Sequence, residues 1–187
     1  MAENTQFKNI KPTGGPAPEK KKRRGAVSEY KKSLVEKQTL KRMYGMSERQ
    51  FKRCVQETLE KMGRVENVSD ELIRTLEKRF DNVIYRLGFA KSRPHARQLV
   101  SHAYFLVNGK PVNIPSLQIE KEDVIAFKEN KKKKALFKNL SEAKKLETPV
   151  WLSLNLSKLE CNVVGEPSLA EVNPPVQIPL IFEFYSR

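Results

Sequence analysis

The chain is poor in the side chains that metal sites and thiol chemistry require. Its 187 residues include two cysteines, Cys54 and Cys161, and two histidines, His95 and His102. The cysteines lie far apart in the sequence, and neither has a histidine at ligand spacing, so the pattern contains no zinc site. We predict that both cysteines are small buried hydrophobic side chains and that the chain needs no metal and no cofactor.

Motifs of catalytic machinery are also missing. The sequence has no nucleophile elbow, no glycine-rich phosphate loop and no nucleophile with a base beside it. Glu77 and Asp81 lie one helical turn apart, but such acid pairs are common on solvated helix faces. The sequence therefore predicts a protein that is not an enzyme.

Long hydrophobic runs are absent as well. No apolar stretch approaches 18 residues, so no transmembrane helix is expected. The first residues lack the apolar core of a secretory signal, and residues 1–18 are not rich in Arg and Ser as an organellar presequence would be. We expect a cytoplasmic protein, or one encoded in the compartment where it works, with no membrane partner.

What the chain has in excess is positive charge. The net charge is +14, and residues 1–100 hold 24 Lys and Arg against 12 Asp and Glu. Residues 151–187 hold 2 against 4, so the C-terminal end does not share this excess. A field of this sign attracts polyanions and speeds their capture. The composition favours a nucleic-acid partner for the first four fifths of the chain.

The first part of the chain divides into a tail and a helical region. Residues 1–26 combine Pro and Gly with a basic run and predict a flexible basic arm. Residues 27–78 predict a helical domain. One helix covers residues 28–44, a second starts at a capping box of Ser47 and Gln50 and ends at Gly63, and a third starts after Ser69 and extends to Phe80.

The second part predicts a mixed unit over residues 79–159. Asp81 and Asn82 are expected to cap a short helix, and Ser92 caps another that runs to about His102. Asn108 and Gly109 between apolar runs predict a hairpin, followed by a strand at residues 124–127 and a basic helix at residues 130–147. Residues 160–187 are expected to complete the helical domain. The predicted fold class is α+β, with two helices packed on a small, mostly antiparallel sheet.

Three arginines of this unit form a candidate phosphate site. Arg93 and Arg97 lie four residues apart on the helix that follows Ser92, so they share a face. Arg86 on the preceding helix can join them across the turn. Each guanidinium can hold two phosphate oxygens in a fork, and the amides that follow Ser92 offer a second anion site.

The same stretch resembles a known RNA-binding module. Residues 79–90, 92–93, 96–100 and 107–109 resemble the module named after ribosomal protein S-four, which has two helices and a five-stranded sheet. Residues 34–38, 41–45, 48–51, 113–115 and 182–187, together with Pro149 and Trp151, resemble the flanks of the bacterial-type ribosomal protein itself. The similarity runs in order from about residue 28 to residue 187.

The resemblance implies a structural constituent of the small ribosomal subunit. Members of the family are primary binders of small-subunit ribosomal RNA, organise its 5′ domain early in assembly, border the channel through which mRNA enters, and influence accuracy through contact with neighbouring ribosomal proteins. Position by position, the residues expected to contact RNA are Arg42, Tyr44, Arg49 and Arg53 in the helical domain, and Arg79, Tyr85, Arg86, Ser92, Arg93, Arg97, Gln98, Ser101, His102 and Lys110 in the module.

The chain departs from the family pattern at several positions. Its N-terminal segment is short and lacks the four zinc-binding cysteines of some members. His95 replaces an acid that would complete a capping box with Ser92, Ala103 replaces a common Gly after the helix, and Cys161 replaces a Gly in a strand. A free-standing RNA-binding regulator, or the targeting domain of an RNA-modifying enzyme, would explain the module but not the matched flanks.

Overall fold

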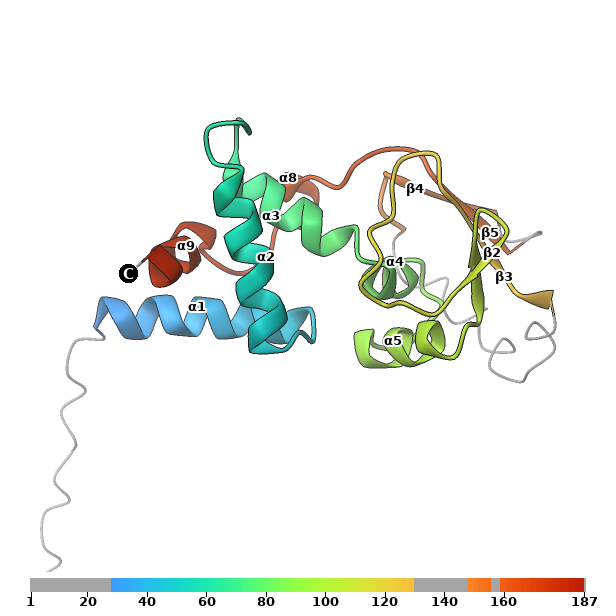
Figure 1. Cartoon of the computed structure of the whole chain (residues 1–187), viewed down its shortest axis with the longest axis horizontal. Coiled ribbons are helices and arrows are strands. Elements are labelled where there is room, and N and C mark those ends of the chain that lie inside the picture. Colours follow the sequence, from blue (N-terminus) through green and yellow to red (C-terminus); the bar gives the residue numbers. More distant parts are fainter. Residues whose placement is uncertain (1–27, 130–147, 156–158, 187) are drawn as a thin grey trace, which may run out of the picture.

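The computed structural model describes residues 28–129, 148–155 and 159–186. The predicted basic arm and the predicted basic helix at residues 130–147 lie outside the described residues. The described chain forms two parts with separate cores, one made of helices and one built on a sheet (Figure 1).

The helical part begins with three helices that start at side-chain caps. Ser28 and Asn67 accept hydrogen bonds from first-turn amides, and Ser47 forms the predicted capping box with Gln50. Two later helices join this part: the first packs Leu169 and Val172 against its core, and the second supplies Ile178 and Ile181. The five helices are α1 (Glu29–Met43), α2 (Glu48–Glu60), α3 (Val68–Glu77), α8 (Leu169–Val172) and α9 (Ile178–Ser186).

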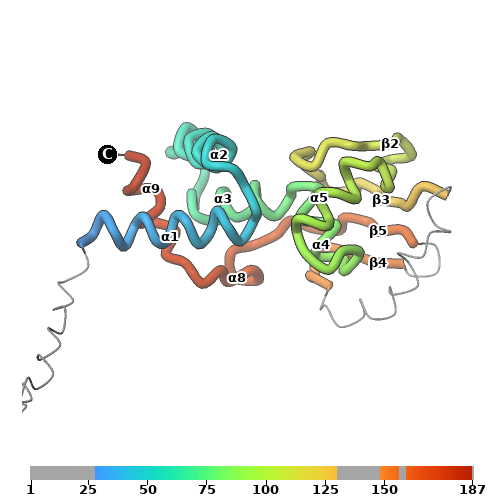
Figure 2. The backbone as a smooth tube through the Cα atoms, turned by 90° about the horizontal axis from the view of Figure 1, so that it is seen from below, coloured from blue at the N-terminus to red at the C-terminus, as the bar shows by residue number. Residues whose placement is uncertain are grey.

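The sheet part has five strands in the order β2-β1-β3-β5-β4, and every pairing is antiparallel (Figure 2). The α+β prediction is therefore confirmed. Buried residues alternate along β1 and β3 and place Phe105 opposite Phe127, so one face of the sheet packs against the helices. The elements are α4 (Phe80–Arg86), α5 (Arg93–Ser101), β1 (Phe105–Val107), β2 (Lys110–Val112), β3 (Val124–Phe127), β4 (Leu152–Asn155) and β5 (Glu160–Val163).

The start of α4 differs from the prediction. Asp81 and Asn82 do not cap the helix. The helix begins at Phe80, and its N-cap residue, Arg79, makes no side-chain cap hydrogen bond. The amides of Phe80 and Asp81 donate instead to the carbonyls of Leu117 and Pro115, at 2.8 and 3.1 Å. A distant loop thus satisfies the first amides, and the side chains of Asp81 and Asn82 are available for other contacts.

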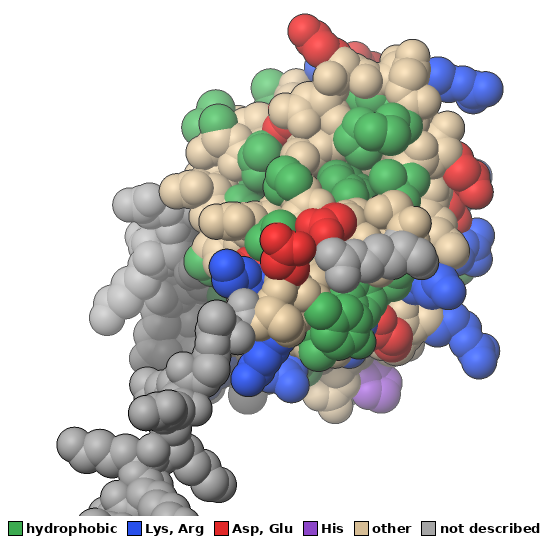
Figure 3. Space-filling model, turned by 90° about the vertical axis from the view of Figure 1, so that its left-hand side faces the viewer, with side chains coloured by type: hydrophobic (Ala, Val, Ile, Leu, Met, Phe, Trp, Pro, Cys, Tyr) green, Lys and Arg blue, Asp and Glu red, His purple; other side chains and the backbone are tan. Residues whose placement is uncertain are grey.

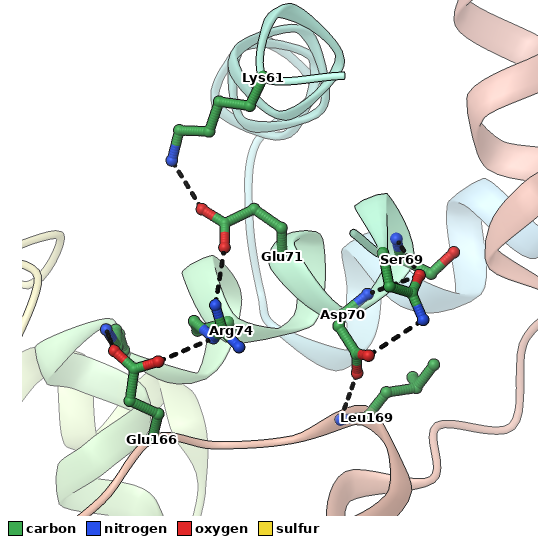
Figure 4. Close-up of polar contacts among 9 residues, drawn as sticks. Lys61, Ser69, Asp70, Glu71, Arg74, Glu166 and Leu169 are labelled. Atoms are coloured by element: carbon green, nitrogen blue, oxygen red, sulfur yellow. Dashed lines mark hydrogen bonds and ion pairs between the residues drawn. The ribbon is translucent and has the colours of Figure 1, made fainter. Parts of the chain in front are cut away.

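The C-terminal segment also divides differently from the prediction. Residues 160–163 form β5 in the sheet, and only the chain after them returns to the helical part. Figure 4 shows the contacts between α3 and the segment that returns to the helical part. Asp70 accepts a hydrogen bond from the amide of Leu169 at 2.9 Å, and Glu166 lies 3.3 Å from Arg74. Glu166 also pairs with Lys78 at 2.6 Å. These contacts fix the segment that links the two parts.

Candidate nucleic-acid interface

A hydrogen bond between the two parts brings α5 against the turn that follows α1. Arg97 donates from Nη1 to the carbonyl oxygen of Gly45 at 2.7 Å. Gly45 has a φ of +60°, a conformation that side chains disfavour, and it lets the chain turn sharply between α1 and α2. The exposed residues around this turn and those of α5 therefore form one continuous surface.

Beneath that surface, a buried carboxylate binds two arginines. Asp81 accepts hydrogen bonds from Arg79 at 3.1 and 2.9 Å and from Arg97 at 3.0 and 2.8 Å. Arg79 is only 4% exposed, and its guanidinium is engaged by Asp81. The prediction that Arg79 contacts RNA therefore lacks support in this geometry, because a polyanion has no access to the side chain.

A second buried carboxylate, Glu77, lies at the end of α3. Glu77 accepts hydrogen bonds from the Tyr44 hydroxyl at 2.6 Å, from Asn82 at 2.7 Å, and from Arg86 at 2.9 and 2.7 Å. Burial opposes its ionisation, but the hydrogen bonds and charge of Arg86, with those of Tyr44 and Asn82, hold the Glu77 pKa below its usual value. Glu77 and Asp81 are thus buried ion-pair partners, and the expectation of a solvated acid pair was wrong.

Tyr44 takes part in this cluster as a core residue. Its ring is 2% exposed, which leaves no face for a base to stack on. Burial, with the neighbouring charge of Glu77, raises the Tyr44 pKa well above its usual value, so the hydroxyl keeps its proton and donates a hydrogen bond to the carboxylate.

Arg93 lies between two aromatic rings. Its guanidinium carbon is 4.9 Å from the ring centroid of Tyr44 and 4.6 Å from that of Tyr85. Its Nε donates to the Asn82 side-chain oxygen at 2.8 Å. Cation–π contacts of this kind hold the guanidinium plane in place. No described residue accepts a hydrogen bond from its Nη1 or Nη2, so the outer edge of the fork is available to a ligand.

The structure therefore brings Arg86, Arg93 and Arg97 together, as the spacing predicted, but gives them different surroundings. Arg86 binds Glu77, Arg97 binds Asp81 and the carbonyl oxygen of Gly45, and Arg93 binds the side chain of Asn82 through Nε alone. The remaining predicted contact residues are exposed: Arg42, Arg49, Arg53, Ser92, Gln98, Ser101, His102 and Lys110. Among these, Arg53 pairs with Glu57 at 2.7 Å, and Lys110 lies on the edge strand β2.

Sequence reasoning missed the three residues that organise the cluster, namely Glu77, Asp81 and Asn82. A signal was available, because two acids and an amide stand among basic and largely hydrophobic residues at 77–86. The substitution at His95 has a local compensation: its Nδ1 accepts a hydrogen bond from the amide of Lys91 at 3.4 Å, while its own amide donates to Ser92.

Two observations concern other kinds of site. Within the described ranges, no group of three or more His, Cys, Asp or Glu is placed to hold a metal ion. Among the same residues, no helix has both the length and the apolar character needed to cross a membrane.

Comparison with known proteins identifies both parts of the chain. Residues 78–125 match the S4 domain, and residues 8–77 match the ribosomal protein S4/S9 N-terminal domain. The small ribosomal subunit protein uS4 of Halothermothrix orenii is 46% identical over 173 residues, which are 92% of this chain and 82% of the relative. The proteins of the same name from Thermodesulfovibrio yellowstonii and Thermotoga petrophila are 45% and 42% identical, over 88% of this chain and 78% of each relative. These relatives are ribosomal proteins and not enzymes, and the chain belongs to the family of small ribosomal subunit protein uS4.

Proposed function

We propose that this chain is a structural constituent of the small ribosomal subunit that binds ribosomal RNA across the junction of its two parts. The observation that carries the proposal is the hydrogen bond from Arg97 to Gly45, which makes one surface of α5 and the α1–α2 turn. Arg42 and Arg49 are exposed on one side of that junction, and Arg93, which is partly buried, lies on the other. In this proposal the helical part and the sheet part are two domains that share one RNA site.

The surface is suited to recognition of RNA shape. Arginines hold phosphates in fixed geometry, whereas double-stranded RNA offers little sequence information in its deep, narrow groove. Gln98, Ser101 and His102 are exposed near the end of α5 and can bond sugars or base edges. We propose that phosphate contacts dominate affinity and that these three polar side chains adjust the position of the RNA.

Binding to the 5′ domain of small-subunit ribosomal RNA, with transfer RNA as the competitor, tests this proposal. The double variant Arg42→Ala and Arg49→Ala should lower affinity for the ribosomal RNA and flatten its salt dependence, since each phosphate contact on duplex-like nucleic acid adds roughly −0.9 to the slope of log affinity against log salt. The matched control is Arg64→Ala, an exposed arginine in the loop between α2 and α3. Equal affinity for both RNAs, disappearing as salt rises, would contradict the proposal and favour a general RNA-binding regulator.

The finer role we propose is that of a primary binder, acting in the cytoplasmic ribosome. It would organise the 5′ domain early in assembly, border the channel through which mRNA enters, and so influence accuracy. A time course of subunit reconstitution tests this. When the chain is left out of the mixture, the 5′ domain of the ribosomal RNA should remain open to cleavage by hydroxyl radicals at early times. Normal early protection without the chain would contradict it.

The far end of the helical part is suited to a protein neighbour. Hydrophobic side chains gather there with acidic ones between them (Figure 3). Tyr30 and Val35 on α1 are 53% and 54% exposed, and the ring of Phe184 lies 5.6 Å from that of Tyr30. Because exposed aromatic and aliphatic side chains gather at this end, we propose that it contacts another small-subunit protein. A photo-cross-linker at Val35 in assembled subunits should capture a protein, and capture of RNA alone would contradict this.

A further inference from the structure

The arginines of the cluster differ in what they can still bind. Arg86 makes two hydrogen bonds to the buried carboxylate of Glu77, and Arg79 makes two to that of Asp81. Arg93 uses only Nε within the described chain, in its bond to Asn82. Arg79 and Arg86 are therefore occupied by buried carboxylates. Arg93 is the arginine whose two terminal nitrogens are available for a bidentate ligand.

The orientation of Asn82 follows from its partners. Its amide nitrogen donates to the backbone oxygen of Glu77 at 3.1 Å and to the carboxylate of the same residue at 2.7 Å. Both partners are acceptors, so only the amide nitrogen can face them. The side-chain oxygen must then face Arg93, where it accepts the hydrogen bond from Nε. The Glu77 carboxylate thus fixes the orientation of the Asn82 amide, and that amide fixes the orientation of the Arg93 guanidinium.

The charge of Glu77 is essential to this arrangement. Asn82 is 2% exposed and Glu77 is fully buried, so neither side chain has water to replace a lost partner. Arg86 and the Tyr44 hydroxyl keep the carboxylate ionised and fixed in position. The rings of Tyr44 and Tyr85 both make cation–π contacts with the Arg93 guanidinium. The guanidinium has therefore lost most of its rotamer freedom before any ligand arrives, which lowers the entropic cost of binding.

We infer that Asn82 and Glu77 are positioning residues that orient the Arg93 guanidinium so that its two terminal nitrogens grip one RNA phosphate. Arg86 has a different role, as the charge partner that allows Glu77 to remain ionised inside the protein. The inference rests on the proposed function, because it names the phosphate contact of the same RNA surface.

A double-mutant cycle on the full chain tests the inference. Arg93→Ala should weaken binding to the 5′ domain of the ribosomal RNA by about tenfold, the size expected for a charged hydrogen-bonded contact. Asn82→Ala should weaken it severalfold by releasing the guanidinium. The double variant should bind as weakly as Arg93→Ala alone, because Asn82 acts only through Arg93. Arg93→Lys keeps the charge but lacks the fork, and it should not restore the affinity.

The alternative outcomes are distinct. Losses that add up in the double variant would mean that Asn82 serves the fold alone, and the inference would be wrong. If the wild-type chain prefers ribosomal RNA and Arg93→Ala changes nothing, the inference fails while the proposed function stands. If the wild-type chain shows no such preference, the proposed function itself fails. Should Asn82→Ala unfold the protein, Glu77→Gln replaces it in the same cycle, since it keeps the size of the side chain and removes the charge that orients Asn82.

Discussion

The Asp81 carboxylate offers a way to separate folding from RNA binding. It joins one arginine that is buried, Arg79, to one that is a third exposed, Arg97, with side-chain exposures of 5% and 34%. Replacement of Asp81 by alanine leaves Arg79 charged, buried and without a partner. Replacement of Arg97 by alanine leaves Asp81 with both hydrogen bonds from Arg79. The two substitutions break the same ion-pair group and should have very different costs.

The magnitudes follow from burial. Removal of one partner from a buried ion pair costs about 3–5 kcal/mol, because the remaining charge has no compensation. Loss of an arginine whose side chain reaches solvent costs about 1 kcal/mol or less. A chain of this kind is stable by only about 5–15 kcal/mol, so Asp81→Ala should remove a large part of the stability and Arg97→Ala only a small part.

Urea unfolding followed by tryptophan fluorescence measures this difference. The chain has one tryptophan, Trp151, which is 3% exposed in the core of the sheet part, so its emission reports on that core directly. Glu120→Ala, at an exposed acid, is the control and should stay within about 0.5 kcal/mol of wild type. Equal losses for Asp81→Ala and Arg97→Ala, or a loss below about 1 kcal/mol for Asp81→Ala, would refute the burial argument.

Three further predictions concern other parts of the chain. Ala103 has a φ of +51° after α5, so Ala103→Gly should raise the free energy of unfolding by about 0.5–1 kcal/mol and Ala103→Val should lower it, both measurable by urea unfolding. Burial raises the pKa of the Cys161 thiol to about 12, so a disulfide reagent should label Cys161 only after denaturation, and a Cys161→Ser variant should lose that late signal. Burial raises the pKa of Glu48, but hydrogen bonds from Lys37, Lys41 and Tyr185 outweigh it and lower that pKa to about 2, so its stabilising effect should be complete above pH 4.5 and lost as pH falls toward 2. The thermal midpoint of Glu48→Gln should therefore fall less steeply with acid than that of wild type, and parallel curves would contradict this.

The sequence predicted those elements whose signals are local. The capping box of Ser47 and Gln50 marks the start of α2 because both partners lie within one turn. Asn108 and Gly109 mark the hairpin because both adopt a positive φ, which a tight turn between β1 and β2 requires. Neither signal depends on any other part of the chain, and both were confirmed.

The predictions that failed depended on distant residues. The boundary between α3 and α4 is set by loop carbonyls at Pro115 and Leu117, which accept the first amides of α4 and make a side-chain cap unnecessary. For the apolar end at residues 178–186 no secondary structure was predicted, and it forms α9 by packing on α1, more than 130 residues earlier in the chain. Helical spacing alone does not indicate such partners, since tertiary contacts override local preference.

The candidate site combines both cases. Spacing on α5 was sufficient to predict that Arg93 and Arg97 share a face and that Arg86 lies nearby. It could not indicate which of these charges remains available, because that depends on Glu77 and Asp81, and spacing alone suggested a solvated pair. Burial changes what these acids do. An acid on a solvated face would repel a phosphate, whereas a buried acid that binds one arginine can orient a neighbouring arginine. In a chain with a net charge of +14, the few acids placed among clustered arginines therefore decide which guanidiniums keep nitrogens available for a ligand.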